Sequence, residues 1–273
     1  MKKSAQKLSR NRTILKFPSC RFVVALTMLF FYGSFSSALA GMMASAKSTA
    51  VCQNMAPTLE LELSRLGVDF GNPIYVRIFK ESNELELWVQ GDDQYKLFKT
   101  YEICAFSGDL GPKLREGDRQ SPEGFYYVTE DKLNPFSRFH LSFDIGFPND
   151  YDKAMGRSGS ALMVHGACVS VGCFAMTNRQ MDEIYTLAEA ALKNGQSSFS
   201  VDVFPFRMTA ENMALHKRSP WMKFWRNLKE GYDLFERNSI PPVASVKNKK
   251  YVFEQKYAET AKNHRSHAQF SIN

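Results

Sequence analysis

The chain has 273 residues, with 35 Lys or Arg against 28 Asp or Glu, so its formal net charge is +7. Seven of these bases and none of the acids lie in residues 1–40, which leaves 28 charges of each sign in the remaining 233 residues. A balanced remainder has no excess positive charge to neutralise phosphates, so the composition argues against nucleic-acid binding. Its length is enough for one sizeable domain.

The N-terminus has the order of a secretory signal peptide. Seven bases within residues 1–21 precede the apolar run Phe22–Tyr32, and Ala38-Leu39-Ala40 provides a small-residue cleavage site. We expect residues 1–40 to be removed and the protein to act in the periplasm or cell wall. The alternative is an inner-membrane anchor, but the apolar run of 11 residues is short of the roughly 20 that span a bilayer. Residues 41–56 are small and polar, and predict a flexible leader.

A helix followed by a strand meander is predicted next. The helix is expected over Pro57–Leu66, with Thr58 as its cap and Gly67 at its end. Alternating apolar residues then predict short strands over 74–80, 84–90, 95–106, 125–129, 139–143 and 161–164. The stretches 107–124 and 144–160 are rich in Gly, Pro and charge, and predict two long loops.

A second helix is marked by the capping box that Thr177 opens, and Asn194-Gly195 ends it. It is expected to bury Met181, Ile184, Tyr185, Ala188 and Leu192. A strand with Phe199, Val201 and Val203 follows. Residues 206–253 are expected to form a helical extension packed on domain 57–205, with an aromatic stripe in its core, and 254–273 a polar tail. The fold class is α+β, mostly β.

Chemistry is concentrated in the segment His165-Gly-Ala-Cys168-Val-Ser-Val-Gly-Cys173-Phe-Ala-Met176. A loop of this length can bring the His165 imidazole to the Cys173 thiol, as a nucleophile and its base require. Gly172 leaves room for a substrate carbonyl, so the N–H groups of Gly172 and Cys173 are candidate oxyanion donors. Gly166 frees the backbone beside the imidazole, where a main-chain carbonyl could orient the ring.

Cysteine counting leaves several alternatives open. Cys20 leaves with the signal peptide, so Cys52, Cys104, Cys168 and Cys173 remain and could form two disulfides in an exported protein. A metal site of His165, Cys168 and Cys173 lacks a fourth ligand. We expect neither a metal nor an organic cofactor.

The motif HGACVSVGCFAM resembles the catalytic signature of the YkuD-type L,D-transpeptidases in its shorter, YafK-like form. The segments from Cys104 through Gly166, together with FPFRMTAEN and SPWMKFWRNLKEGYDLFE, resemble the same pattern, so the likeness covers residues 57–253. It implies a β-sandwich or barrel as the catalytic fold, Cys173 as nucleophile, His165 as general base, and the Gly166 carbonyl as its orienting group.

This sequence departs from the wider family at three points. The His-to-Cys spacing is shorter, Val171 replaces a second histidine and Ala175 replaces an arginine. The missing arginine removes a cation that faces the substrate. Other cations in the long loops are candidates to bind the substrate carboxylate: Arg157, Lys113, Arg115 and Arg119.

The resemblance implies acyl transfer at the L-centre of diaminopimelate in peptidoglycan stem peptides, through a Cys173 thioester. The thioester is resolved either by an amine, as in transpeptidation, or by water, as in an amidase that releases a peptidoglycan-linked lipoprotein. We expect a monomer. The alternative is a non-catalytic wall-binding protein whose cysteines are all paired.

Overall fold

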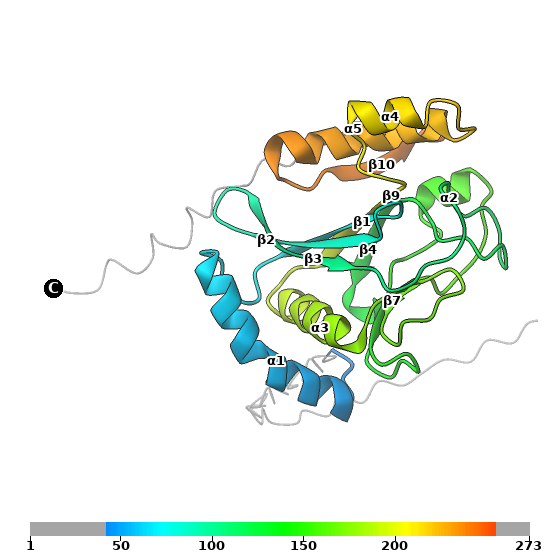
Figure 1. Ribbon diagram of the computed structural model, residues 1–273. Coiled ribbons are helices and arrows are strands. Elements are labelled where there is room, and N and C mark those ends of the chain that lie inside the picture. The colour runs from blue at the N-terminus through cyan, green and yellow to red at the C-terminus, as the bar shows by residue number, and fades with distance from the viewer. Residues whose placement is uncertain (1–41, 255–273) are drawn as a thin grey trace, which may run out of the picture. The chain divides into compact units, whose positions relative to one another are not determined.

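The computed structural model describes residues 42–254 (Figure 1). The predicted signal peptide and the polar tail beyond Glu254 lie outside the described residues. The main sheet has the strand order β3-β2-β1-β9-β4. Its strands are β1 (Ile74–Phe79), β2 (Glu84–Gln90), β3 (Tyr95–Glu102), β4 (Gly124–Thr129) and β9 (Ser198–Phe204). Adjacent strands are antiparallel except β1 and β9, which are parallel.

Both faces of this sheet are covered, as the fully buried strand β1 shows. Ile74, Val76 and Ile78 pack in a core shared with α1 (Ala46–Arg65) and α3 (Asn178–Lys193). Phe79 points to the opposite face, where a second core contains the aromatic residues of α5 (Met222–Asn238). Figure 1 shows α1 and α3 on one side of the sheet and α5 on the other.

Helix α1 is twice as long as the sequence predicts, and it takes in residues expected to form a flexible leader. Ser45 and Ser48 form its capping box, and Pro57 lies inside it. The expected start at Pro57 is therefore wrong. Val51, Cys52 and Met55 pack against the core, and this tertiary contact makes the small polar segment helical where its composition alone does not.

A second, four-stranded sheet has the order β5-β6-β7-β8. It consists of β5 (Leu133–Asn134), which follows a 3-10 turn at Glu130–Lys132, β6 (Ser142–Asp144), β7 (Met163–His165) and β8 (Phe174–Ala175). Strands β7 and β8 run parallel. Both sheets are open, and no barrel closes within residues 42–254. The loop expected over 144–160 contains the short helix α2 (Asp150–Ala154), which Asn149 caps.

Helix α3 is confirmed with its Thr177–Gln180 capping box, and its predicted core residues are buried. After β9 the chain forms α4 (Ala210–Leu215), capped by Thr209 as expected, and then α5. The aromatic stripe of α5 lies in the core as expected.

The C-terminal extension is only half helical, which corrects the prediction for 206–253. Strands β10 (Val243–Lys247) and β11 (Lys250–Glu254) pair as an antiparallel hairpin. Its two turn residues, Asn248 and Lys249, have positive φ of 53° and 57°, which is the backbone of a tight two-residue hairpin turn. Asn-Lys is a weaker turn signal than Asn-Gly, so the sequence pattern missed it. Within the described part of the chain, no helix has the length and apolarity to span a membrane.

Candidate active site

The pairing of β7 with β8 places the two predicted catalytic residues on neighbouring segments of the backbone. His165 ends β7 opposite Ala175, and Cys173 directly precedes β8. The Cys173 sulfur accepts a contact of 3.5 Å from the Met163 N–H. Cys173 therefore lies in the bend beside β7, the strand that ends at His165.

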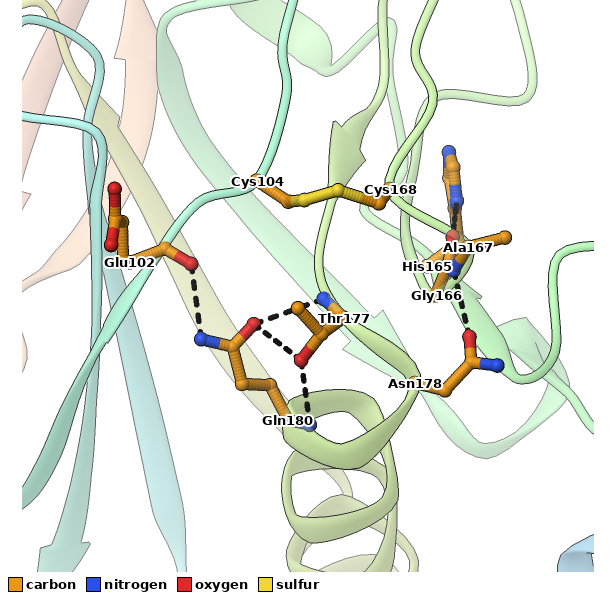
Figure 2. The surroundings of a disulfide bond; sticks show 9 residues. All are labelled: Glu102, Cys104, His165, Gly166, Ala167, Cys168, Thr177, Asn178 and Gln180. Atoms are coloured by element: carbon orange, nitrogen blue, oxygen red, sulfur yellow. Dashed lines mark hydrogen bonds between the residues drawn. A yellow bond between two sulfur atoms is a disulfide. The ribbon is translucent and has the colours of Figure 1, made fainter.

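The imidazole of His165 is buried and held in one tautomer. Its Nδ1–H donates to the Gly166 carbonyl at 2.6 Å, as Figure 2 shows, and the Phe139 ring lies 4.8 Å away. With the proton on Nδ1, Nε2 carries the free lone pair that a general base needs. Burial lowers the pKa of His165, an effect that the Gly166 hydrogen bond partly offsets. The imidazole is thus neutral at neutral pH.

Position 166 has no room for a side chain. A Cβ there would lie 2.7 Å from Asn178 Oδ1 and 2.9 Å from His140 Cβ. Asn178, the first residue of α3, accepts a hydrogen bond of 2.8 Å from the Ala167 N–H (Figure 2). The glycine thus lets α3 and the His140 loop close around the backbone that orients the imidazole.

A disulfide between Cys104 and Cys168 ties the loop between the two candidate catalytic residues to the segment after β3 (Figure 2). The Cys104 N–H donates to the Ala175 carbonyl at 2.9 Å, so the same segment also borders β8. Cys173 and Cys52 are free thiols. Of the two disulfides that these four cysteines could form, the described residues contain one. It removes Cys168 from any metal site and leaves Cys173 available.

The Cys173 thiol lies in a mixed electrostatic environment. Burial is the main effect and raises its pKa, Asp144 raises it further, and the Met163 N–H and the Lys113 ammonium lower it. The resting sulfur is therefore a protonated thiol. Its second contact is the Ala161 carbonyl at 3.7 Å. To form a hydrogen bond with His165, the thiol must turn away from that carbonyl. Catalytic hydrogen bonds that are long or absent in the free enzyme commonly form when substrate binds.

The backbone around the sulfur corrects one expectation. The Gly172 N–H donates to Ser170 Oγ at 3.1 Å, so it is not an open oxyanion donor. The Ser170 hydroxyl in turn donates to the Cys173 carbonyl at 2.7 Å. Gly172 has φ of +131°, a conformation that side chains disfavour. The Cys173 N–H remains as the candidate donor of the predicted pair.

Two serines near the sulfur were missed by sequence reasoning. Ser170 forms the tight turn just described, and the buried Ser121 donates from Oγ to the Gly172 carbonyl at 3.0 Å. Ser121 comes from the 107–124 loop, whose length and composition were the available signal. Both hydroxyls fix the peptide planes that flank Cys173.

The four cations predicted to bind the substrate carboxylate fall into a buried pair and an exposed pair. Arg157 is buried in an ion pair of 2.8 Å with Asp152 and lies over the rings of Tyr151 and Phe224, so it is a structural residue and not a free substrate cation. Lys113 is also buried and pairs with Asp118, yet its charge acts on the Cys173 thiol.

Arg115 and Arg119 are exposed. They flank Asp118, whose pKa is lowered to about 2; burial acts against this shift, and the Lys113 bond and three backbone N–H groups outweigh it. The carboxylate is therefore ionised at neutral pH and fixes the turn of the 113–120 segment.

The protein-family model for the YkuD L,D-transpeptidase catalytic domain matches residues 73–203 of this chain, which include His165 and Cys173. "Putative L,D-transpeptidase YafK" of Escherichia coli strain K12 is 52% identical over 182 residues, covering 67% of this chain and 74% of that protein. The chain belongs to the YkuD family of L,D-transpeptidases. The same-named protein of E. coli O157:H7 matches to the same extent.

Two solved structures also resemble the fold at a distance. The helical cell shape determining protein Pgp2 of Campylobacter jejuni is 18% identical with a TM-score of 0.39, covering 68% of this chain and 79% of that one. Bd1075 of Bdellovibrio bacteriovorus is 19% identical with a TM-score of 0.35, covering 68% and 78%.

Membership of the YkuD family makes this chain a peptidoglycan-related L,D-transpeptidase, because the family's catalytic domain acts on peptidoglycan stem peptides. The expected α+β fold, mostly sheet, is confirmed.

Proposed function

We propose that this chain is an exported cysteine enzyme that forms a thioester on peptidoglycan stem peptides, with Cys173 as nucleophile and His165 as its base. One observation carries the proposal. Cys173 keeps a free thiol in the bend before β8, the strand that pairs with β7 and its last residue His165, while Cys104 and Cys168 nearby are paired. A protein that used its cysteines only as crosslinks would have no reason to leave this sulfur free next to the strand that carries a tautomer-fixed imidazole.

The reaction begins when His165 Nε2 takes the thiol proton as the sulfur attacks the carbonyl at the L-centre of diaminopimelate. The new S–C bond gives a tetrahedral oxyanion, for which the Cys173 N–H is the donor at hand. The imidazolium then protonates the leaving amine as the C–N bond breaks, and a thioester remains. Burial supports this order, because a raised thiol pKa and a lowered imidazole pKa favour the neutral pair at rest.

An acceptor amine or water completes the cycle. An amine produces a crosslink or attaches a lipoprotein lysine, whereas water releases the acyl group, as in an amidase that frees a lipoprotein from the wall. Both outcomes use the same two residues. The predicted signal peptide supports a periplasmic location, where this polymer is found.

The decisive experiment incubates purified sacculi, with and without bound lipoprotein, with the mature protein and with Cys173→Ala. We expect the wild-type protein to change the muropeptide profile and the variant to leave it unaltered. New crosslinks identify a transferase, and freed stems identify a hydrolase. Identical profiles from both proteins would remove the enzyme proposal. Thiol titration without reductant supplies a control, in which we expect a reactive Cys173.

A further inference from the structure

A cavity lies at the end of the main sheet opposite the candidate active site. The 107–124 loop, which contacts the backbone at Cys173, follows the C-terminal end of β3. This cavity is lined instead by Ile74 and Ser198, the first residues of β1 and β9, and by Tyr95, the first residue of β3. A six-residue strand is about 20 Å long, so the two sites are separate. The cavity has a volume of about 730 Å³, within the range of small-molecule sites.

Its floor is a serine between two aromatic rings. Ser200 on β9 pairs with Tyr127 on β4, and the parallel register of β1 places Tyr75 on its other side. Ser198 is two residues earlier and shares this face. Elsewhere on the same face β9 carries Asp202 and the large Phe204, so the hollow arises where β9 switches to small side chains.

Its roof is the linker between α5 and β10. The Tyr95 N–H donates to the Ser239 carbonyl at 2.8 Å, which fixes one end of the linker at β3. At the other end the Ala244 N–H donates to the Tyr127 hydroxyl at 3.0 Å, over β4. From β3 to β4 the sheet is four strand spacings wide, about 19 Å. The five residue steps from Ser239 to Ala244 reach at most about 18 Å, so the linker must cross the sheet in a nearly straight line. Pro241 and Pro242 make the linker stiff. A stiff, straight linker does not sag into the space above Ser198 and Ser200, so the cavity stays open.

The polar groups of this cavity are available for a ligand. Among the described residues, the side chains of Ser198, Ser200 and Gln90 and the hydroxyl of Tyr95 make no hydrogen bond to another residue. The Tyr75 hydroxyl is committed to Asp202 and that of Tyr127 to the Ala244 backbone, so these two tyrosines offer mainly ring surface. Within the described chain no Lys, Arg or His lines the cavity, and Asp93 is its one charged lining residue.

We propose that this cavity binds a neutral N-acetylated sugar of a glycan strand. Hydroxyl and acetamido groups match unpaired serine, tyrosine and glutamine side chains, and pyranose faces match tyrosine and proline surfaces. The lack of cationic residues disfavours phosphates and the anionic stem peptide. The identification of the sugar with peptidoglycan rests on the proposed function, since that polymer carries N-acetylated sugars beside the stem peptides. The cavity then holds the strand while a stem reaches Cys173.

The test measures binding of tetra-N-acetylchitotetraose to the full mature chain in the Cys173→Ala background, by calorimetry or by NMR shift changes. We expect Ser200→Leu, which fills the floor, to weaken binding at least about tenfold, equivalent to about 1.4 kcal/mol. Thr100→Leu, the same kind of change at an exposed position of the edge strand β3, should leave affinity within about twofold. Thermal unfolding shows whether each variant folds. If Ser200→Leu does not, Tyr95→Ala takes its place, with an expected loss of about fivefold.

Two further ligands sharpen the result. Maltotetraose, which lacks acetamido groups, should bind more weakly, and a free stem tetrapeptide should not displace the chitotetraose. Absence of binding at millimolar sugar, binding unaffected by the cavity variants, or displacement by the tetrapeptide would each overturn the proposal. Sugar binding does not require the thioester. The binding experiment therefore tests the cavity by itself, and a negative result in the sacculus experiment would overturn the proposed enzyme activity without changing the measured sugar affinity.

Discussion

A buried ion pair fastens the active-site loop, and breaking it is our most specific prediction. Lys80 follows β1, and the side chains of Lys80 and Glu123 are fully buried and 3.1 Å apart. The Lys80 ammonium also donates to the carbonyls of Asp109, Gly111 and Ser121. These acceptors stand at both ends of the 107–124 loop, and Ser121 is the residue that supports the backbone beside Cys173.

The expected magnitude follows from leaving a carboxylate buried without its cation. In Lys80→Met, Glu123 keeps only its bonds from the Gly111 N–H and the Trp225 indole, and three carbonyls lose a donor. Removing one partner of a buried pair destabilises by about 3–5 kcal/mol. For a domain of this size that corresponds to a melting temperature lower by about 6–20 °C. We also expect kcat to fall, because Ser121 loses its anchor.

The assay is urea unfolding followed by fluorescence, combined with turnover on sacculi. Lys99→Met is the matched control: Lys99 also bridges two carboxylates, Glu62 and Glu183, but its side chain is 32% exposed, so we expect a loss of about 1 kcal/mol or less. Adding Glu123→Gln to Lys80→Met removes the stranded charge and should restore part of the stability. The reasoning is refuted if Lys80→Met costs no more than Lys99→Met, or if the double variant is less stable than Lys80→Met.

Three further outcomes are expected. Because burial lowers the pKa of His165 below 6.5, kcat/KM at pH 6.5 should retain more than half of its plateau, and an acid limb centred at or above 6.5 would contradict the base assignment. Gly166→Ala should cost about 1–3 kcal/mol by overpacking and lower kcat as the imidazole shifts; normal kcat would show that the carbonyl does not orient the ring. Burial raises the pKa of Asp202 from 3.8 to about 7; the folded state then binds more protons than the unfolded state between these values, so stability falls as pH rises from about 4 to about 7, by up to about 4 kcal/mol. Asp202→Asn should lack that slope in unfolding free energy, and an unchanged slope would assign it to other groups.

Much of the fold follows from local patterns. The capping box at Thr177 and the alternation in β1, β2 and β9 predict elements close to their observed bounds. Hydrogen bonds and side chains within a few residues decide these features, so a sequence window contains the relevant information. The α1 helix shows the limit, because residues 46–56 become helical through contacts with the core.

The candidate site likewise has a part that local sequence predicts and a part that depends on tertiary contacts. The residue types in the His165–Cys173 segment predict thiol chemistry, because a short loop between them restricts where the two side chains can lie. The substrate cations are less predictable. Arg157 looks like any loop arginine until its buried partner Asp152 is seen.

By itself the sequence determined the family, the two candidate catalytic residues, and the glycine that must stand beside the imidazole. Only the tertiary structure decided that Cys168 pairs with Cys104, which lies 64 residues away, and that Ser121 supports the Cys173 backbone. It also decided that the Gly172 N–H is already used by Ser170. The physical reason is range: chain neighbours set local conformation, whereas a disulfide, a buried ion pair or an occupied donor depends on which distant groups the packed core brings within bonding distance.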